Sequence, residues 1–136
     1  MTSDCAAVRT ILIIDDDDQL RGFLSELLSS KGFEIHTAKN GLDGLNAFRE
    51  NKPDLVLTDI VMPEKEGLEL IKLLKKEDPA IHIIAMTGGG NYGLGKNYLQ
   101  LAEVLGASKA LSKPFRTADL LSEIEKLGAS NASSQE

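Results

Sequence analysis

The sequence predicts an α/β protein with a doubly wound, five-stranded parallel sheet and helices on both faces. Five short apolar runs alternate with five segments whose apolar residues recur at helical spacing. Three of the runs are almost continuously hydrophobic, which is typical of strands that are covered on both faces. Because crossovers between parallel strands are right-handed, this (βα)5 alternation favours the strand order 2-1-3-4-5.

The elements follow from the positions of these runs and of the residues that interrupt them. The expected strands are residues 10–14, 34–38, 54–58, 82–86 and 109–112. The helical stripes between and after them are Leu20, Phe23, Leu24, Leu27 and Leu28; Leu42, Leu45 and Phe48; Leu68, Ile71 and Leu74; Tyr98, Leu101, Ala102 and Leu105; and Leu120, Leu121, Ile124 and Leu127. Glycine, asparagine or proline separates most neighbouring elements, as at Gly32, Asn40, Pro53, Pro79 and Gly106. We expect one domain over residues 9–127, an N-terminal tail over 1–8 and a flexible, small and polar tail over 128–136.

Composition narrows the class of protein. The chain has 136 residues, which fits one domain with a sizeable core, and a net charge of −6 with no basic stretch beyond Lys75-Lys76. A nucleic-acid partner is therefore not expected. No apolar run is long enough to span a membrane, and the N-terminus lacks the pattern of a signal peptide. A single cysteine, Cys5, fits a reducing cytoplasm, where we expect the protein to be located.

Polar side chains follow four of the five predicted strands. Asp15, Asp16, Asp17 and Asp18 follow the first, Thr58-Asp59 the third, Thr87 the fourth and Ser112-Lys113-Pro114 the fifth. In open parallel sheets, ligands bind outside the carboxyl ends of the strands. Carboxylates, a hydroxyl and an ammonium group are therefore expected to meet at one edge of the sheet.

These groups together suit phosphoryl chemistry at a carboxylate. Carboxylates that lie close together repel one another, and a hard divalent cation such as Mg²⁺ relieves the repulsion. An aspartate can accept a phosphoryl group, and Lys113 and Thr87 could meet the negative charge on its oxygens. Asp17 and Asp18 precede a helical stripe, so for these two we expect helix capping.

The stretches "ILIIDDDD", "LVLTDIVMPEKEGLELI", "IIAMTGG" and "GASKALSKPF" resemble the response-regulator receiver domain of two-component signalling, from about Arg9 to Leu127. The resemblance implies a flavodoxin-like fold with Asp59 as the phosphoacceptor. It implies that Asp15, Asp16, Asp59 and the backbone carbonyl of Val61 hold Mg²⁺. It also implies that Thr87 and Lys113 contact the phosphoryl group, with a cis Lys113–Pro114 bond.

The sequence departs from the family pattern at the fifth strand and after the fourth. The family usually carries an aromatic switch residue at the position that Ala110 occupies here. The glycine-rich stretch "TGGGNYGLGKN" (87–97) makes the segment after the fourth strand longer than is typical. We hypothesise that Gly88–Gly95 replaces the missing switch, because glycines reach two backbone conformations at little steric cost.

Three other functions can be weighed against this one. Residues 88–97 also match dinucleotide and phosphate-loop spacings, but Asn97 stands where the phosphate loop needs a hydroxyl. A Mg-dependent aspartyl-phosphate hydrolase of the haloacid-dehalogenase type would use Asp15 and Asp17, yet Gln19 replaces its small hydroxyl residue. A flavin binder would place its phosphate badly beside four aspartates.

We therefore expect a stand-alone receiver and not a turnover enzyme. It would take a phosphoryl group from the phosphohistidine of a sensor kinase or phosphotransfer protein. It would then signal by contact with an unidentified protein. The face of the fourth helix, fifth strand and fifth helix is the expected contact surface, for that target or for a second copy of the chain.

Overall fold

The structure is a computed structural model that describes residues 8–60, 66–87, 103, 106–112 and 115–134. Its sheet has five parallel strands in the order β2-β1-β3-β4-β5, which confirms the predicted fold class and order. The strands are β1 (Thr10–Ile14), β2 (Glu34–Ala38), β3 (Leu55–Asp59), β4 (His82–Thr87) and β5 (Lys109–Ser112). The helices with described bounds are α1 (Asp18–Ser30), α2 (Gly41–Asn51), α3 (Glu66–Glu77) and α5 (Thr117–Ser134).

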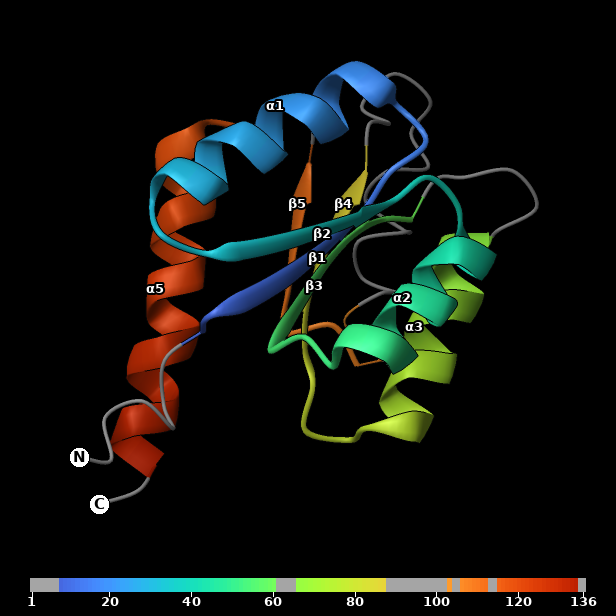
Figure 1. Cartoon of the computed structure of the whole chain (residues 1–136). Coiled ribbons are helices and arrows are strands. Elements are labelled where there is room, and N and C mark those ends of the chain that lie inside the picture. Colours follow the sequence, from blue (N-terminus) through green and yellow to red (C-terminus); the bar gives the residue numbers. More distant parts are fainter. Residues whose placement is uncertain (1–7, 61–65, 88–102, 104–105, 113–114, 135–136) are drawn as a thin grey trace.

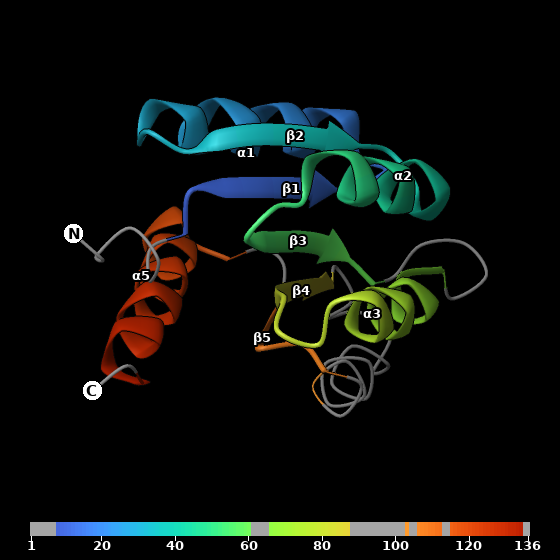
Figure 2. The same ribbon diagram turned by 60° about the horizontal axis from the view of Figure 1, so that its bottom comes forward.

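Helices cover both faces of the sheet, with α1 and α5 on one side and α2 and α3 on the other (Figures 1 and 2). Each side has its own apolar core. Leu24, Leu28, Leu120 and Ile124 pack against one face, and Phe48, Leu68, Ile71 and Leu74 against the other. The doubly wound architecture thus follows from burying one stripe of each helix on the sheet.

The inner strands supply both cores at once, because successive side chains in a strand point to opposite faces. In β1, Ile11 and Ile13 face the α1–α5 side while Leu12 and Ile14 face the α2–α3 side, and all four are buried. A polar residue inside this strand would have to be buried on one of these faces. Polar groups are therefore confined to the ends of the strand, where the site lies.

Local signals in the sequence fix the helix ends. The Asn40 side chain caps α2 by accepting a hydrogen bond from the Asp43 N–H at 2.8 Å. At the other end of α2, Lys52 takes a left-handed conformation with φ of 47°, and its N–H bonds to the Phe48 carbonyl. Gly32, with φ of 98°, supplies the turn between α1 and β2.

The structure differs from the predicted boundaries in three places. β4 ends at Thr87, one residue later than expected. β3 begins and ends one residue later than expected, so that Asp59 is the last residue of the strand itself. α5 continues to Ser134, past the last apolar residue of its stripe, Leu127. Alanine and serine are tolerated in a helix, so the loss of the stripe did not end it. The limits of the domain and its tails stay predictions, as does the fourth helix, whose stripe (98–105) lies mainly outside the described residues.

Candidate functional site

Three carboxylates meet at the carboxyl edge of the sheet. Asp15 follows β1 and Asp59 ends β3, and these strands pair side by side, with Ile14 opposite Thr58. Oxygen atoms of Asp15, Asp16 and Asp59 all lie within 4.8 Å of one another. Asp15 is 0% exposed and Asp59 4%, whereas Asp16 is open to solvent. Two of the three charges are therefore largely removed from water, where repulsion between them is strongest.

Backbone pairing continues past the strand ends and holds these residues. The Asp15 N–H donates to the Ala38 carbonyl at 3.1 Å, which ties it to the end of β2. The Ile60 N–H donates to the Met86 carbonyl at 2.9 Å, so the chain is still fixed to β4 just after Asp59. The Thr58 hydroxyl donates to the Asp59 carbonyl at 3.1 Å. Both buried aspartates thus extend from a rigid sheet, and not from a loop.

The next two aspartates have the expected local role. Asp17 is the N-cap of α1, and its Oδ1 accepts from the N–H groups of Gln19 and Leu20 at 3.0 and 3.2 Å. Asp18 is the first residue of the helix. Among the described acidic residues, Asp17 and Asp18 do not belong to the carboxylate group that could hold a metal ion. The Asp15–Asp17 pair that a haloacid-dehalogenase site would use is therefore not assembled.

The other predicted site residues are described only in part. Thr87 ends β4, opposite Ser112 of β5, so the backbones of these two residues reach the same edge as Asp59. Val61, Lys113 and the whole glycine-rich segment after Thr87 lie outside the described residues. Ala110 lies in β5 opposite Ala85 and is half-buried against the core on the α2–α3 side.

Sequence reasoning missed Arg21, which contacts the acidic turn from α1. Its Nη1 donates to the Asp15 carbonyl at 2.7 Å, and its Nη2 pairs with Asp18 Oδ1 at 2.5 Å. The spacing was a usable signal, because residues three apart on a helix face one another and an arginine three residues after an aspartate can reach it. The bond to the Asp15 carbonyl could not be read in the same way, because it depends on how the turn before the helix folds.

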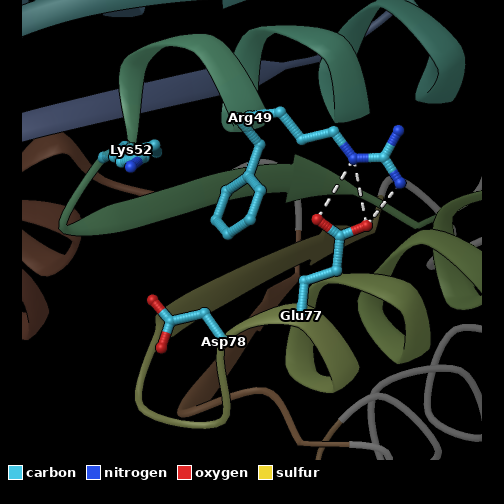
Figure 3. A pocket seen from close by; sticks show the side chains of 6 residues that line it. Arg49, Lys52, Glu77 and Asp78 are labelled. Carbon is cyan, nitrogen blue, oxygen red and sulfur yellow. Dashed lines mark hydrogen bonds and ion pairs between the residues drawn. The ribbon is translucent and has the colours of Figure 1, made fainter.

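A separate hollow lies at the opposite edge of the sheet. Its volume is about 330 Å³, and it is lined by Phe48, Arg49, Lys52, Pro53, Glu77 and Asp78. Arg49 of α2 and Glu77 of α3 point toward each other across it (Figure 3), with Nε–Oε1 and Nε–Oε2 distances of 3.1 Å. Lys52 and Pro53 lead into β3 and Asp78 leads toward β4, so the hollow is at the amino ends of the strands, remote from the carboxylates.

Comparison with known proteins identifies the family. Residues 11–125 match the response regulator receiver domain. The response regulator receiver protein CpdR of Brucella abortus is 35% identical over 120 residues, which are 88% of this chain and 97% of CpdR. Sporulation initiation phosphotransferase F of Bacillus subtilis is 34% identical over 116 residues, or 85% and 90% of the two chains. A receiver domain from Clostridium thermocellum has a TM-score of 0.82 and 31% identity over 92% of this chain and 98% of its own.

The chain belongs to the response regulator receiver family, as the sequence predicts. It is a phosphoacceptor domain of two-component signalling. The alternative of an aspartyl-phosphate hydrolase of the haloacid-dehalogenase type is not favoured. Receiver domains bind Mg²⁺ at a cluster of aspartates, and they exchange signals with histidine kinases or phosphotransfer proteins and with downstream targets. They are in general signalling domains that become phosphorylated on an aspartate and do not turn over a substrate. None of the helices in the described part of the chain is long and apolar enough to cross a membrane.

Proposed function

We propose that Asp59 is the residue that accepts the phosphoryl group. The observation that supports this is its position: a nearly buried carboxylate at the end of β3, within 4.8 Å of the carboxylate oxygens of Asp15 and Asp16. A buried carboxylate beside two others is an unfavourable arrangement unless a cation joins it. The arrangement is therefore better explained by a reaction that uses a bound cation than by a contribution to the stability of the fold.

The acidic group is suited to Mg²⁺. Three carboxylates with oxygens this close can share one small cation, and the exposure of Asp16 leaves a side open to water and to a phosphate. Asp15, Asp16 and Asp59 would hold the ion together with the carbonyl of Val61, which lies outside the described residues. When bound, the ion neutralises the carboxylates and the oxygens of the incoming phosphoryl group.

The transfer itself forms one bond and breaks one. An Asp59 carboxylate oxygen forms an O–P bond to the phosphorus of a phosphohistidine while the P–N bond to the imidazole breaks. The imidazole nitrogen leaves with the bonding electron pair and becomes neutral by keeping or taking up a proton. Thr87 ends β4 and Lys113 follows the neighbouring strand β5 in the sequence. We assign both to the phosphoryl oxygens, whose charge a hydroxyl and an ammonium would meet.

The signal would leave through a protein contact. The chain would receive its phosphoryl group from a sensor kinase or a phosphotransfer protein in the cytoplasm and pass the signal to a target that neither sequence nor fold identifies. The surface around β5 and α5 is the proposed contact face, for the target or for a second copy of the chain. The glycine-rich segment Gly88–Gly95 would act as the switch, in place of an aromatic side chain at Ala110.

Intact-mass measurement after incubation with acetyl phosphate and Mg²⁺ tests the acceptor. The parent protein should gain one phosphoryl group, and Asp59→Asn should gain none, because an amide oxygen is a poor nucleophile for phosphorus. Asp54→Asn is the matched control, since Asp54 lies just before the other end of the same strand and should leave labelling intact. Labelling of Asp59→Asn at the parental level would overturn the assignment.

A further inference from the structure

An arginine of α1 contacts the segment that joins β1 to α1. This segment carries four consecutive aspartates, Asp15 to Asp18, and the Arg21 side chain bonds to the first and the last of them. Nη1 donates to the Asp15 carbonyl at 2.7 Å and Nη2 to Asp18 Oδ1 at 2.5 Å. The Arg21 side chain is 19% exposed, which is low for an arginine on the first turn of a surface helix. One guanidinium thus joins Asp15, the first residue after β1, to Asp18, the first residue of α1.

The bond to the carbonyl determines where Asp16 lies. The Asp15 N–H is bonded to Ala38, and Asp15 Oδ1 accepts from the Asp17 N–H at 2.9 Å. With its carbonyl also held, the peptide plane between Asp15 and Asp16 has a set direction, because that unit is planar. The start of the exposed Asp16 is therefore oriented by Arg21. Without that bond, the peptide could rotate and carry the Asp16 carboxylate away from Asp59.

We propose that Arg21 is a positioning residue for the acidic site: it holds the Asp15–Asp16 peptide so that both carboxylates face Asp59. The proposal rests on the proposed metal-binding function of that site. Residues that orient metal ligands from outside the coordination sphere commonly change metal affinity about 10- to 100-fold when they are removed. We expect a loss of affinity near the lower end of this range.

The sign of the effect separates positioning from charge. A guanidinium repels a divalent cation, so removing its charge alone would tighten Mg²⁺ binding. Removing an orienting bond would weaken binding. Lys39 provides the matched control, because it lines the same hollow as Arg21 at this edge of the sheet and is exposed. The Lys39 side chain forms neither a hydrogen bond nor an ion pair with another residue in the described part of the chain.

The experiment is calorimetric titration of Mg²⁺ into the parent, Arg21→Ala, Arg21→Lys and Lys39→Ala, without a phosphoryl donor. Arg21→Ala should raise Kd about tenfold, whereas Lys39→Ala should leave it unchanged or lower it. Arg21→Lys keeps the charge but loses the planar pair of donors, so it should also weaken binding. Thermal unfolding in a chelator shows whether each variant is folded at the titration temperature.

Each outcome is decisive. The proposal would be overturned if Arg21→Ala bound Mg²⁺ as tightly as the parent or more tightly and Arg21→Lys had the parental Kd. Arg21 would then act through its charge or through fold stability alone. If Arg21→Ala fails to fold, Arg21→Lys carries the test: parental Kd overturns the proposal and a raised Kd supports it. A parent that binds no Mg²⁺ would instead overturn the proposed function of the site, and the role of Arg21 with it.

Discussion

Gly44 shows how one residue sets the distance between a helix and the strand that carries the site. A Cβ at Gly44 would lie 2.5 Å from Ile14 Cδ1 and 3.0 Å from Cγ1, and Ile14 is fully buried directly before Asp15. The helix α2 can thus approach β1 only because residue 44 has no side chain. Any larger residue must push α2 outward or rotate Ile14.

Gly44→Ala should therefore destabilise the protein, although alanine is the better helix former. The gain in helix propensity is about 1 kcal/mol and overpacking costs about 1–3 kcal/mol, so we expect a net loss of up to about 2 kcal/mol. Gly22→Ala is the control: it is also within a helix, but an added Cβ there meets no atom within 4 Å. The free energy of unfolding of Gly22→Ala should rise by up to about 1 kcal/mol. Urea unfolding measures both, and equal shifts in the two variants would contradict the close approach.

At the scale of elements, the described contact with the clearest charge complementarity between helices is the Arg49–Glu77 pair. Hydrogen bonding to Arg49 lowers the pKa of Glu77, and hydrogen bonding to Glu77 raises the pKa of Arg49; the attraction of opposite charges adds to both shifts. Arg49 is more than half exposed, so solvent and salt weaken the interaction. The pair is better regarded as aligning α2 with α3 than as a main source of stability.

The sign of these shifts predicts a pH dependence. Because the pKa of Glu77 is lower in the folded state, its contribution is fully present above the unfolded pKa and is lost as the pH falls through the folded value. Because the pKa of Arg49 is raised in the folded state, its contribution to folding stability is fully present below the unfolded pKa. That contribution is lost only at strongly alkaline pH. Glu77→Gln should therefore lower the urea midpoint slightly at neutral pH and not in acid, where the parent has lost the pair. Glu50→Gln, an equal change of charge at an exposed site on α2, should show no such difference.

This effect should also depend on the partner and on salt. In a protein that already carries Arg49→Gln, the Glu77→Gln change should have little further effect on the urea midpoint at neutral pH. Added salt should reduce the difference in urea midpoint between the parent and the Glu77→Gln single variant. An undiminished effect of Glu77→Gln in the Arg49→Gln background would show that Glu77 acts through other contacts.

The elements themselves could largely be predicted from the sequence, whereas the contacts between them could not. β1, β2 and β5 have their predicted bounds because each apolar run stops at residues that favour turns or carry charge. The end of α5 was missed because alanine and serine after Leu127 permit a helix without requiring one. Arg49 and Glu77 are 28 residues apart, and nothing local specifies that their helices lie side by side. The alternatives for the acidic residues were resolved by the turn before α1, which turns Asp17 toward the helix and leaves Asp15 and Asp16 with Asp59.

At the scale of the whole molecule, the Mg²⁺ site proposed at Asp15, Asp16 and Asp59 would link folding to metal binding. Folding brings Asp59 to within 4.8 Å of the neighbouring Asp15 and Asp16, so the added repulsion destabilises the folded state and a cation bound there would stabilise it. At a Mg²⁺ concentration about 100 times Kd, the gain is about 2.7 kcal/mol. The protein should therefore unfold at a higher temperature in Mg²⁺ than in a chelator.

Asp16→Asn should change the stability of the folded state in opposite directions with and without Mg²⁺. It should not disturb the core, because Asp16 is exposed. In a chelator the variant should be more stable than the parent, since one repelling charge is gone. Mg²⁺ should stabilise the variant less than it stabilises the parent, because each tenfold loss of affinity removes about 1.4 kcal/mol of the metal's contribution to stability. Glu26→Gln makes the same change in net charge at an exposed position of α1 and should follow the parent in both conditions. If thermal unfolding shows equal Mg²⁺-dependent shifts in the parent and Asp16→Asn, the ion binds elsewhere, and the carboxylate group at the end of β1 and β3 is not what couples metal to folding.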